Sequence, residues 1–189
     1  MRPPKPPINP NHNKKVKNMS LQTASKTTTK GQAMPHASTA KASKTSASNL
    51  TFTTKFGEIT LNPNLLLSFP HGLFGFRECT QFGLAKLPGM ESSPLMLMQC
   101  TNQPAIAFLV ADPSQLGLEI SAEDKTDALK QTKLNGKTTQ FLTILTLYDS
   151  GESYYLTANL KAPVLVESQT QTGVQFILNN KSYSTQHKI

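Results

Sequence analysis

Residues 154–168 read YYLTANLKAPVLVES. The Tyr, Leu, Thr and Val content of this stretch predicts two short strands, with Asn159 and Pro163 set between them. Pro163 has no N–H to donate to a strand ladder, so we expect it to start the second strand. Asn159 can cap backbone groups where the two strands change direction. The stretch therefore predicts the corner of a β-barrel, and not a catalytic amide.

The same kind of pattern runs through the chain from Thr51 onward, as short apolar runs separated by turn residues. The run AIAFLVA at 105–111 is apolar on both faces, which is typical of a central strand in a sheet that is covered or closed on itself. The other predicted strands are 51–56, 58–61, 65–69, 81–87, 95–100, 140–149, 154–160, 163–168 and 174–180.

One stretch, residues 121–132, predicts a helix. Ser121 is a suitable N-cap, acidic residues follow in the first turn, and Gly136 is expected to stop the helix. Its apolar face is thin, so we expect a surface connection. The predicted fold is mainly β: a single small β-barrel-like domain of antiparallel strands with one short helix, spanning residues 51–189.

The first 50 residues differ in composition from the rest of the chain. They are rich in Lys, Ser, Thr, Ala and Pro, and they hold nine of the 19 basic residues but none of the 11 acidic ones. A segment with so few large apolar residues cannot offset its ordering entropy, so we expect a disordered basic tail. The body is then close to neutral. The chain has no apolar run long enough to span a bilayer and no signal-peptide pattern, so we expect a cytoplasmic protein.

The sequence shows no recognised local signature of catalysis, and we expect neither a cofactor nor a metal. Cys79 and Cys100 lack metal-ligand spacing and are expected to be buried free thiols. The segment FPHGLFGFR contains a GLFG tetrad, but it lacks the basic residues of a phosphate-binding loop. We interpret it as a turn that places Phe69, Phe74 and Phe76 on the core.

Five motifs occur together in a fixed order: FGEI at 56–59, FPHGLFGF at 69–76, LMQCTNQPAIAFLVADP at 97–113, TANLKAPVLV at 157–166 and VQFILNNKSYSTQH at 174–187. In this order they resemble the flagellar assembly factor FliW family. The resemblance implies a non-enzymatic, monomeric β-barrel-like protein of the cytoplasm. It also implies that the protein binds flagellin and, when free of flagellin, binds the RNA-binding repressor CsrA and relieves its repression of flagellin mRNA.

The resemblance leaves the binding residues open. Binding to the basic protein CsrA is expected to use acidic residues of the one charge-rich stretch: Glu119, Glu123, Asp124 and Asp127. If that stretch is only surface, the site is expected on the strands around Asp112 and Asn159. Flagellin, whose termini are implied to be helical and apolar, is expected in an apolar groove. The sequence departs from the family pattern at SQLGLEIS (114–121) and at Gln186 and Lys188.

Two other classes remain as alternatives. A flavin-binding split-barrel enzyme is also a compact β-barrel, but it needs phosphate-binding groups, and the body has a single arginine, Arg77. A nucleic-acid-binding module needs basic residues interleaved with exposed aromatics on the strands, and the aromatic strands here carry few bases. We therefore expect no direct, specific contact with nucleic acid.

Overall fold

The computed structural model describes residues 48–149, 151 and 153–189. The expected disorder of the basic tail thus falls outside the described residues, except for its last three positions. Of these, Leu50 already belongs to the first strand and packs with Phe52 against a cluster of buried residues. The ordered sheet structure therefore begins one residue earlier than the composition change suggested.

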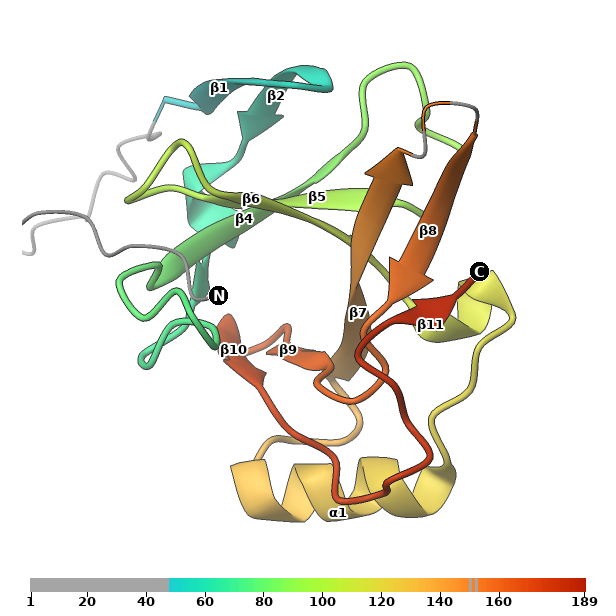
Figure 1. Cartoon of the computed structure of the whole chain (residues 1–189). Coiled ribbons are helices and arrows are strands. Elements are labelled where there is room, and N and C mark those ends of the chain that lie inside the picture. The colour runs from blue at the N-terminus through green and yellow to red at the C-terminus, as the bar shows by residue number, and fades with distance from the viewer. Residues whose placement is uncertain (1–47, 150, 152) are drawn as a thin grey trace, which may run out of the picture. The chain divides into compact units, whose positions relative to one another are not determined.

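The described residues form a mainly β protein with one α-helix (Figure 1). The strands are β1 (Leu50–Thr54), β2 (Gly57–Leu61), β3 (Leu67–Ser68), β4 (Gln81–Lys86), β5 (Met96–Cys100), β6 (Ala107–Ala111), β7 (Thr139–Asp149), β8 (Tyr154–Ala158), β9 (Val164–Glu167), β10 (Thr172–Gln175) and β11 (His187–Lys188). The helix α1 spans Ala122–Thr132, and two 3-10 turns span Pro63–Leu65 and Pro113–Leu116.

Nine strands form one sheet that closes on itself through β7. The sheet order is β11-β8-β7-β6-β5-β4-β3-β10-β9, and β9 pairs again with β7. The pairings within it are antiparallel except for a single parallel bridge between Ser68 and Thr172. The predicted barrel-like fold is confirmed. The strands β1 and β2 form a separate hairpin.

Residues 154–168 form the corner at which the sheet divides. Leu145 of β7 faces Ala158 of β8, and Leu142 faces Val164 of β9. Between these two pairs, β7 advances by three residues and the opposing chain by six. Three residues between β8 and β9 are therefore looped out of the pairing. The first half of β7 belongs to the closed barrel with β9, and the second half forms a protruding hairpin with β8.

Asn159 holds this corner together through three hydrogen bonds. Its side-chain oxygen accepts the Ala162 N–H at 2.9 Å, and its N–H donates to the Ile144 carbonyl at 2.9 Å. Its carbonyl accepts the hydroxyl of the buried Thr143 at 2.9 Å. The amide in the middle of the apolar run therefore satisfies local backbone groups, as an Asx-type turn does.

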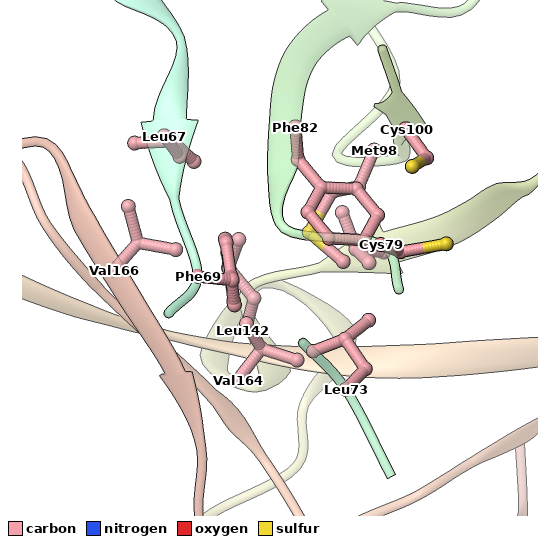
Figure 2. Close-up of a cluster of buried hydrophobic side chains, with 11 residues drawn as sticks. Leu67, Phe69, Leu73, Cys79, Phe82, Met98, Cys100, Leu142, Val164 and Val166 are labelled. Carbon is pink, nitrogen blue, oxygen red and sulfur yellow. The ribbon is translucent and has the colours of Figure 1, made fainter. Parts of the chain in front are cut away.

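The main core lies inside the barrel (Figure 2). Phe69 and Phe82 meet edge to face, with ring centroids 5.0 Å apart, and both are fully buried. Cys79 and Cys100 lie in the same cluster as free thiols, as predicted. Phe108, by contrast, is only half-buried, although β6 lies between β5 and β7.

The helix α1 begins and ends as predicted, but a different residue terminates it. The Ser121 hydroxyl accepts the Asp124 N–H at 3.0 Å, which caps the first turn. The helix ends at Thr132 because Lys133 takes a left-handed conformation with φ 58°, so the expected stop at Gly136 is wrong. The helix also covers a second buried cluster through Ala128, and is more than a surface connection.

A buried carboxylate fixes the turn between β9 and β10. Glu167 accepts the N–H groups of Gln169 at 3.1 Å and Thr170 at 2.7 Å, and also the Thr170 hydroxyl. Hydrogen bonds from the Thr138 and Thr170 side chains lower the pKa of Glu167 from 4.5 to about 2. The folded protein therefore stabilises the ionised form of Glu167.

This pKa shift predicts an acid-sensitive contribution to stability. A folded-state pKa below the unfolded value stabilises the protein above about pH 4.5, and the contribution is lost as the pH falls from 4.5 toward 2. We expect Glu167→Gln to be less stable than the parent at pH 7. The difference in unfolding free energy should shrink across that acid range, as measured by urea unfolding at pH 7, 5 and 3. A difference that stays constant with pH would show that the charge of Glu167 is not involved.

Candidate partner-binding site

The protruding half of the β7–β8 hairpin carries an exposed apolar groove, which we call the β7–β8 groove. Leu147 of β7 faces Leu156 of β8, and neither side chain is fully buried. The exposed fractions are 70% for Tyr154, 45% for Leu147 and 39% for Ile189. The groove has a volume of about 450 Å³ and is lined by Leu116, Leu147, Tyr154, Tyr155, Leu156 and Ile189. Large apolar side chains exposed together are typical of an interaction surface.

The opposite face of this hairpin carries a stacked aromatic pair. The rings of Tyr148 and Tyr155 lie 5.0 Å apart and nearly parallel, at 8°. Lys188 places its ammonium group 4.9 Å from the Tyr155 ring centre, and the Gln186 amide donates to the Tyr148 hydroxyl at 3.2 Å. A cation over an aromatic face stabilises this arrangement. The C-terminal strand β11 is thereby held against β8, which it pairs at Lys188 and Thr157.

Residues from both departures from the family pattern lie beside this hairpin. Leu116, from the 114–121 stretch, lines the β7–β8 groove, and Gln186 and Lys188 contact the two tyrosines on the other face. These positions are far apart in the sequence, so their common location could not be seen without the fold. An apolar groove was expected from the sequence, but its location was not, because strand periodicity placed Leu147 and Tyr154 in strands without assigning their exposure.

The acidic residues expected to contact CsrA lie elsewhere, on and before α1. Glu119, Glu123 and Asp127 are exposed. Asp127 accepts a hydrogen bond from the Gln131 amide at 2.8 Å, one helical turn away. These three carboxylates remain available to a basic partner.

Asp124 has a structural role that the sequence did not reveal. One of its carboxylate oxygens accepts three hydrogen bonds, from the Ser121 hydroxyl at 2.7 Å, the Tyr183 hydroxyl at 2.9 Å and the Asn180 amide at 3.1 Å. The hydrogen bonds from Ser121 and then Asn180 lower the pKa of Asp124. Asp124 therefore ties the C-terminal segment to the start of α1, which makes it a poor choice for a charge-reversal test.

Asp112 and Asn159 lie near the same end of the sheet. Ala111, which precedes Asp112, pairs with Thr143, whose hydroxyl donates to the Asn159 carbonyl. Asp112 caps the turn that follows it by accepting the Ser114 N–H at 2.9 Å and the Ser114 hydroxyl at 2.7 Å. Both side chains thus bind their own backbone neighbourhood, and each of them positions a strand end beside the hairpin.

Other chemistry is sparse in the described part of the chain. Within residues 48–149, 151 and 153–189, no group of three or more His, Cys, Asp or Glu side chains is placed to hold a metal ion. Burial and the neighbouring Cys100 raise the pKa of the Cys79 thiol to about 11, which favours the unreactive protonated form. None of the described helices has the length and apolar character needed to cross a membrane.

The small barrel carries an exposed apolar groove on its β7–β8 hairpin, and a surface of this kind suits contact with another protein. Comparison with known proteins identifies the family. The family model described as "FliW protein" matches residues 51–189. The chain therefore belongs to the FliW family of flagellar assembly factors, which are not enzymes. The alternative of a flavin-binding enzyme is thereby excluded.

Individual relatives agree with the family match. The chain is 37% identical over 135 residues to the flagellar assembly factor FliW of Bacillus velezensis, which covers 70% of this chain and 91% of the relative. It is 33% identical over 136 residues to that of Geobacillus kaustophilus, covering 70% and 90%. A crystal structure of the flagellar assembly factor FliW superposes with a TM-score of 0.58 at 29% identity, covering 75% of this chain and 96% of that one.

Proposed function

We propose that this protein is a cytoplasmic, monomeric partner-switching factor of flagellar assembly. It binds newly made flagellin, and when secretion removes flagellin, the free protein binds CsrA and relieves its repression of flagellin mRNA. The observation that supports this proposal best is the exposed β7–β8 groove in a chain of the FliW family. A protein that holds an aggregation-prone subunit before export needs such an apolar surface.

The β7–β8 groove suits a helical segment of flagellin. The apolar face of an amphipathic helix binds by placing side chains from successive turns into a hydrophobic groove. Tyr154 and Leu147 offer large side chains on a rigid strand pair, and aromatic anchors of this kind dominate binding energy in protein interfaces. The backbone of the hairpin is fixed by five residue pairs between β7 and β8, so little ordering cost arises on binding.

CsrA binding is assigned to the exposed carboxylates near α1. We expect each of the reversals Glu119→Lys, Glu123→Lys and Asp127→Lys to weaken CsrA binding about two- to fivefold at low salt, because an exposed ion pair contributes up to about 1 kcal/mol. Flagellin binding should not change. Calorimetric titration at two salt concentrations measures both affinities, since screening removes the effect of exposed charges at high salt.

The matched control for these reversals is Glu58→Lys. Glu58 is also exposed, but it lies on the β1–β2 hairpin, and the substitution changes the net charge by the same amount. Equal loss of CsrA affinity in Glu58→Lys would mean that net charge alone matters. Unchanged affinity in all three reversals would move the CsrA site away from α1, to the strands near Asp112 and Asn159.

Co-purification tests the proposal as a whole. The tagged full-length chain, expressed in its own cells, should retain flagellin, and it should retain CsrA when flagellin is depleted. Mass spectrometry of the eluate identifies both proteins. Absence of flagellin and CsrA under both conditions would contradict the proposed function, whereas loss of one alone would assign the chain a single partner.

A further inference from the structure

The turn formed by residues 70–77, which we call the 70–77 turn, is built to hold one aromatic side chain in solvent. Leu73 and Phe76 exchange backbone hydrogen bonds at 3.2 and 2.8 Å, which closes a tight turn with Phe74 and Gly75 at its tip. Gly75 has φ +84°, a conformation that glycine adopts without strain. Phe74 is 56% exposed, so the expectation that it packs on the core is wrong.

The position of this turn is fixed from three directions. Leu73 is buried in the main core, where Figure 2 shows it below Phe82 and Cys79. The Phe76 ring packs edge to face on Phe108, with centroids 5.0 Å apart. A Cβ at Gly72 would lie 2.4 Å from the Phe76 carbonyl oxygen, so the chain there passes too closely for any other residue.

The Gln175 side chain completes the support of the turn tip. Its oxygen accepts the Phe74 N–H at 3.0 Å, and its amide nitrogen donates to the Ala162 carbonyl at 3.1 Å. The aromatic tip is thus connected to β10 and to the corner before β9. A side chain held in solvent on so rigid a support loses little conformational entropy when a partner covers it.

Two hollows flank the 70–77 turn, and both are free of acidic residues. One has a volume of about 500 Å³ and includes Phe74, Arg77 and Gln175 in its wall. The other, of about 420 Å³, lies toward the C-terminal end of α1. They share Pro70, His71, Gly72 and Val174, so the two hollows adjoin each other. A segment that occupies both hollows would therefore pass over these shared residues.

Arg77 provides a charge to this surface. It is exposed, and its guanidinium has no hydrogen-bond or ion-pair partner among the residues that the structure describes. Arginine and aromatic residues, including Phe, are both enriched at protein interfaces. Since no carboxylate lines either hollow, an acidic group of a partner would complement the charge of Arg77.

We propose that the 70–77 turn is a second docking site, which binds a partner segment that carries an apolar side chain next to an acidic one. The apolar side chain packs on Phe74 in the hollow, and the carboxylate pairs with Arg77. Figure 1 places the loop after β3 on the opposite side of the barrel from β8 and β11, so this site is separate from the β7–β8 groove. The proposal does not depend on which partner occupies that groove.

Short peptides test this proposal on the full-length, ¹⁵N-labelled chain. The probes are acetyl-Phe-Glu-Leu-amide and its neutral counterpart acetyl-Phe-Gln-Leu-amide, followed by amide chemical shifts. We expect the acidic peptide to shift signals of residues 72–77 and 173–175 and to bind about two- to fivefold more tightly than the neutral one, as for an exposed ion pair. Arg77→Gln should make the two affinities equal, and Phe74→Ser should weaken both.

Two controls test the geometry of the Arg77 side chain and the kind of carboxylate that the site binds. Arg77→Lys keeps the charge but loses the planar fork, so its preference for the acidic peptide should be reduced but not absent. Equal binding of both peptides to the parent, or shifts confined to the β7–β8 groove, would overturn the proposal. Acetyl-Phe-Leu with a free terminal carboxylate is the third probe. If acetyl-Phe-Leu binds and the two amidated peptides do not, the site binds a C-terminal carboxylate. The proposal of an internal acidic segment is then wrong.

Discussion

Replacing Phe69 by alanine is expected to lower the free energy of unfolding by about 3–5 kcal/mol, the usual cost of truncating a buried aromatic side chain. Its ring has no exposed surface and meets Phe82 edge to face at 5.0 Å. The space cannot close around the loss, because the ring lies against the backbone of Gly173. A Cβ at Gly173 would come within 2.1 Å of the ring.

Urea unfolding of the full-length chain measures this effect, with Phe74→Ala as the control. Phe74 lies five residues away, at the tip of the 70–77 turn, and it is mostly exposed. The control should therefore change the unfolding free energy by no more than about 0.5 kcal/mol. A cost below about 1 kcal/mol for Phe69→Ala would mean that the barrel interior repacks, contrary to the rigid contact with Gly173.

Introducing a charge at Leu147 is expected to weaken flagellin binding about 30-fold or more, because the loss of a central apolar anchor costs 2 kcal/mol or more. Leu147→Asp places a carboxylate in the β7–β8 groove, where a bound helix would have to desolvate it. The position is 45% exposed in the free protein, so the fold should tolerate the change. Titration calorimetry with purified flagellin gives the affinity.

Thr146→Asp is the matched control, because it adds the same charge to the next residue of β7. Side chains of neighbouring strand residues point to opposite faces, so this carboxylate does not enter the groove. Thr146 is also exposed, so burial does not separate the two positions. If both variants lose flagellin equally, the effect is not specific to the groove. If Leu147→Asp binds as the parent does, flagellin uses another surface.

Much of the fold could be predicted from the sequence because local patterns determine strands and caps. Ser121 starts α1, and Pro163 immediately precedes β9, as the residue types indicated. The prediction was poorest for residues 174–180, where only Val174 and Gln175 lie in a strand. Two apolar residues that follow lie outside any strand: Leu178 packs beneath α1, and Ile177 is exposed.

The candidate sites were harder to predict, because exposure depends on which strands pair. Apolar residues occur in β7 on both sides of Leu145, but only the first half of the strand is covered by the barrel. Strand β11 has two residues and no periodicity to detect, yet it brings Lys188 onto Tyr155. Asp124 looked like an ordinary helix-start acid, and its contact with Tyr183 spans 59 positions.

The three residues looped out at Asn159 have a consequence for how this protein can change over evolutionary time. They divide β7 into an inner length, which pairs with β9 and closes the barrel, and an outer length beyond Leu145, which pairs with β8 and does not close it. Substitutions beyond Leu145 can therefore alter partner preference while the fold stays above its stability threshold. Leu116, Gln186 and Lys188 all lie beside that outer length, so a change at any of them alters the surface of the hairpin and leaves the barrel interior untouched.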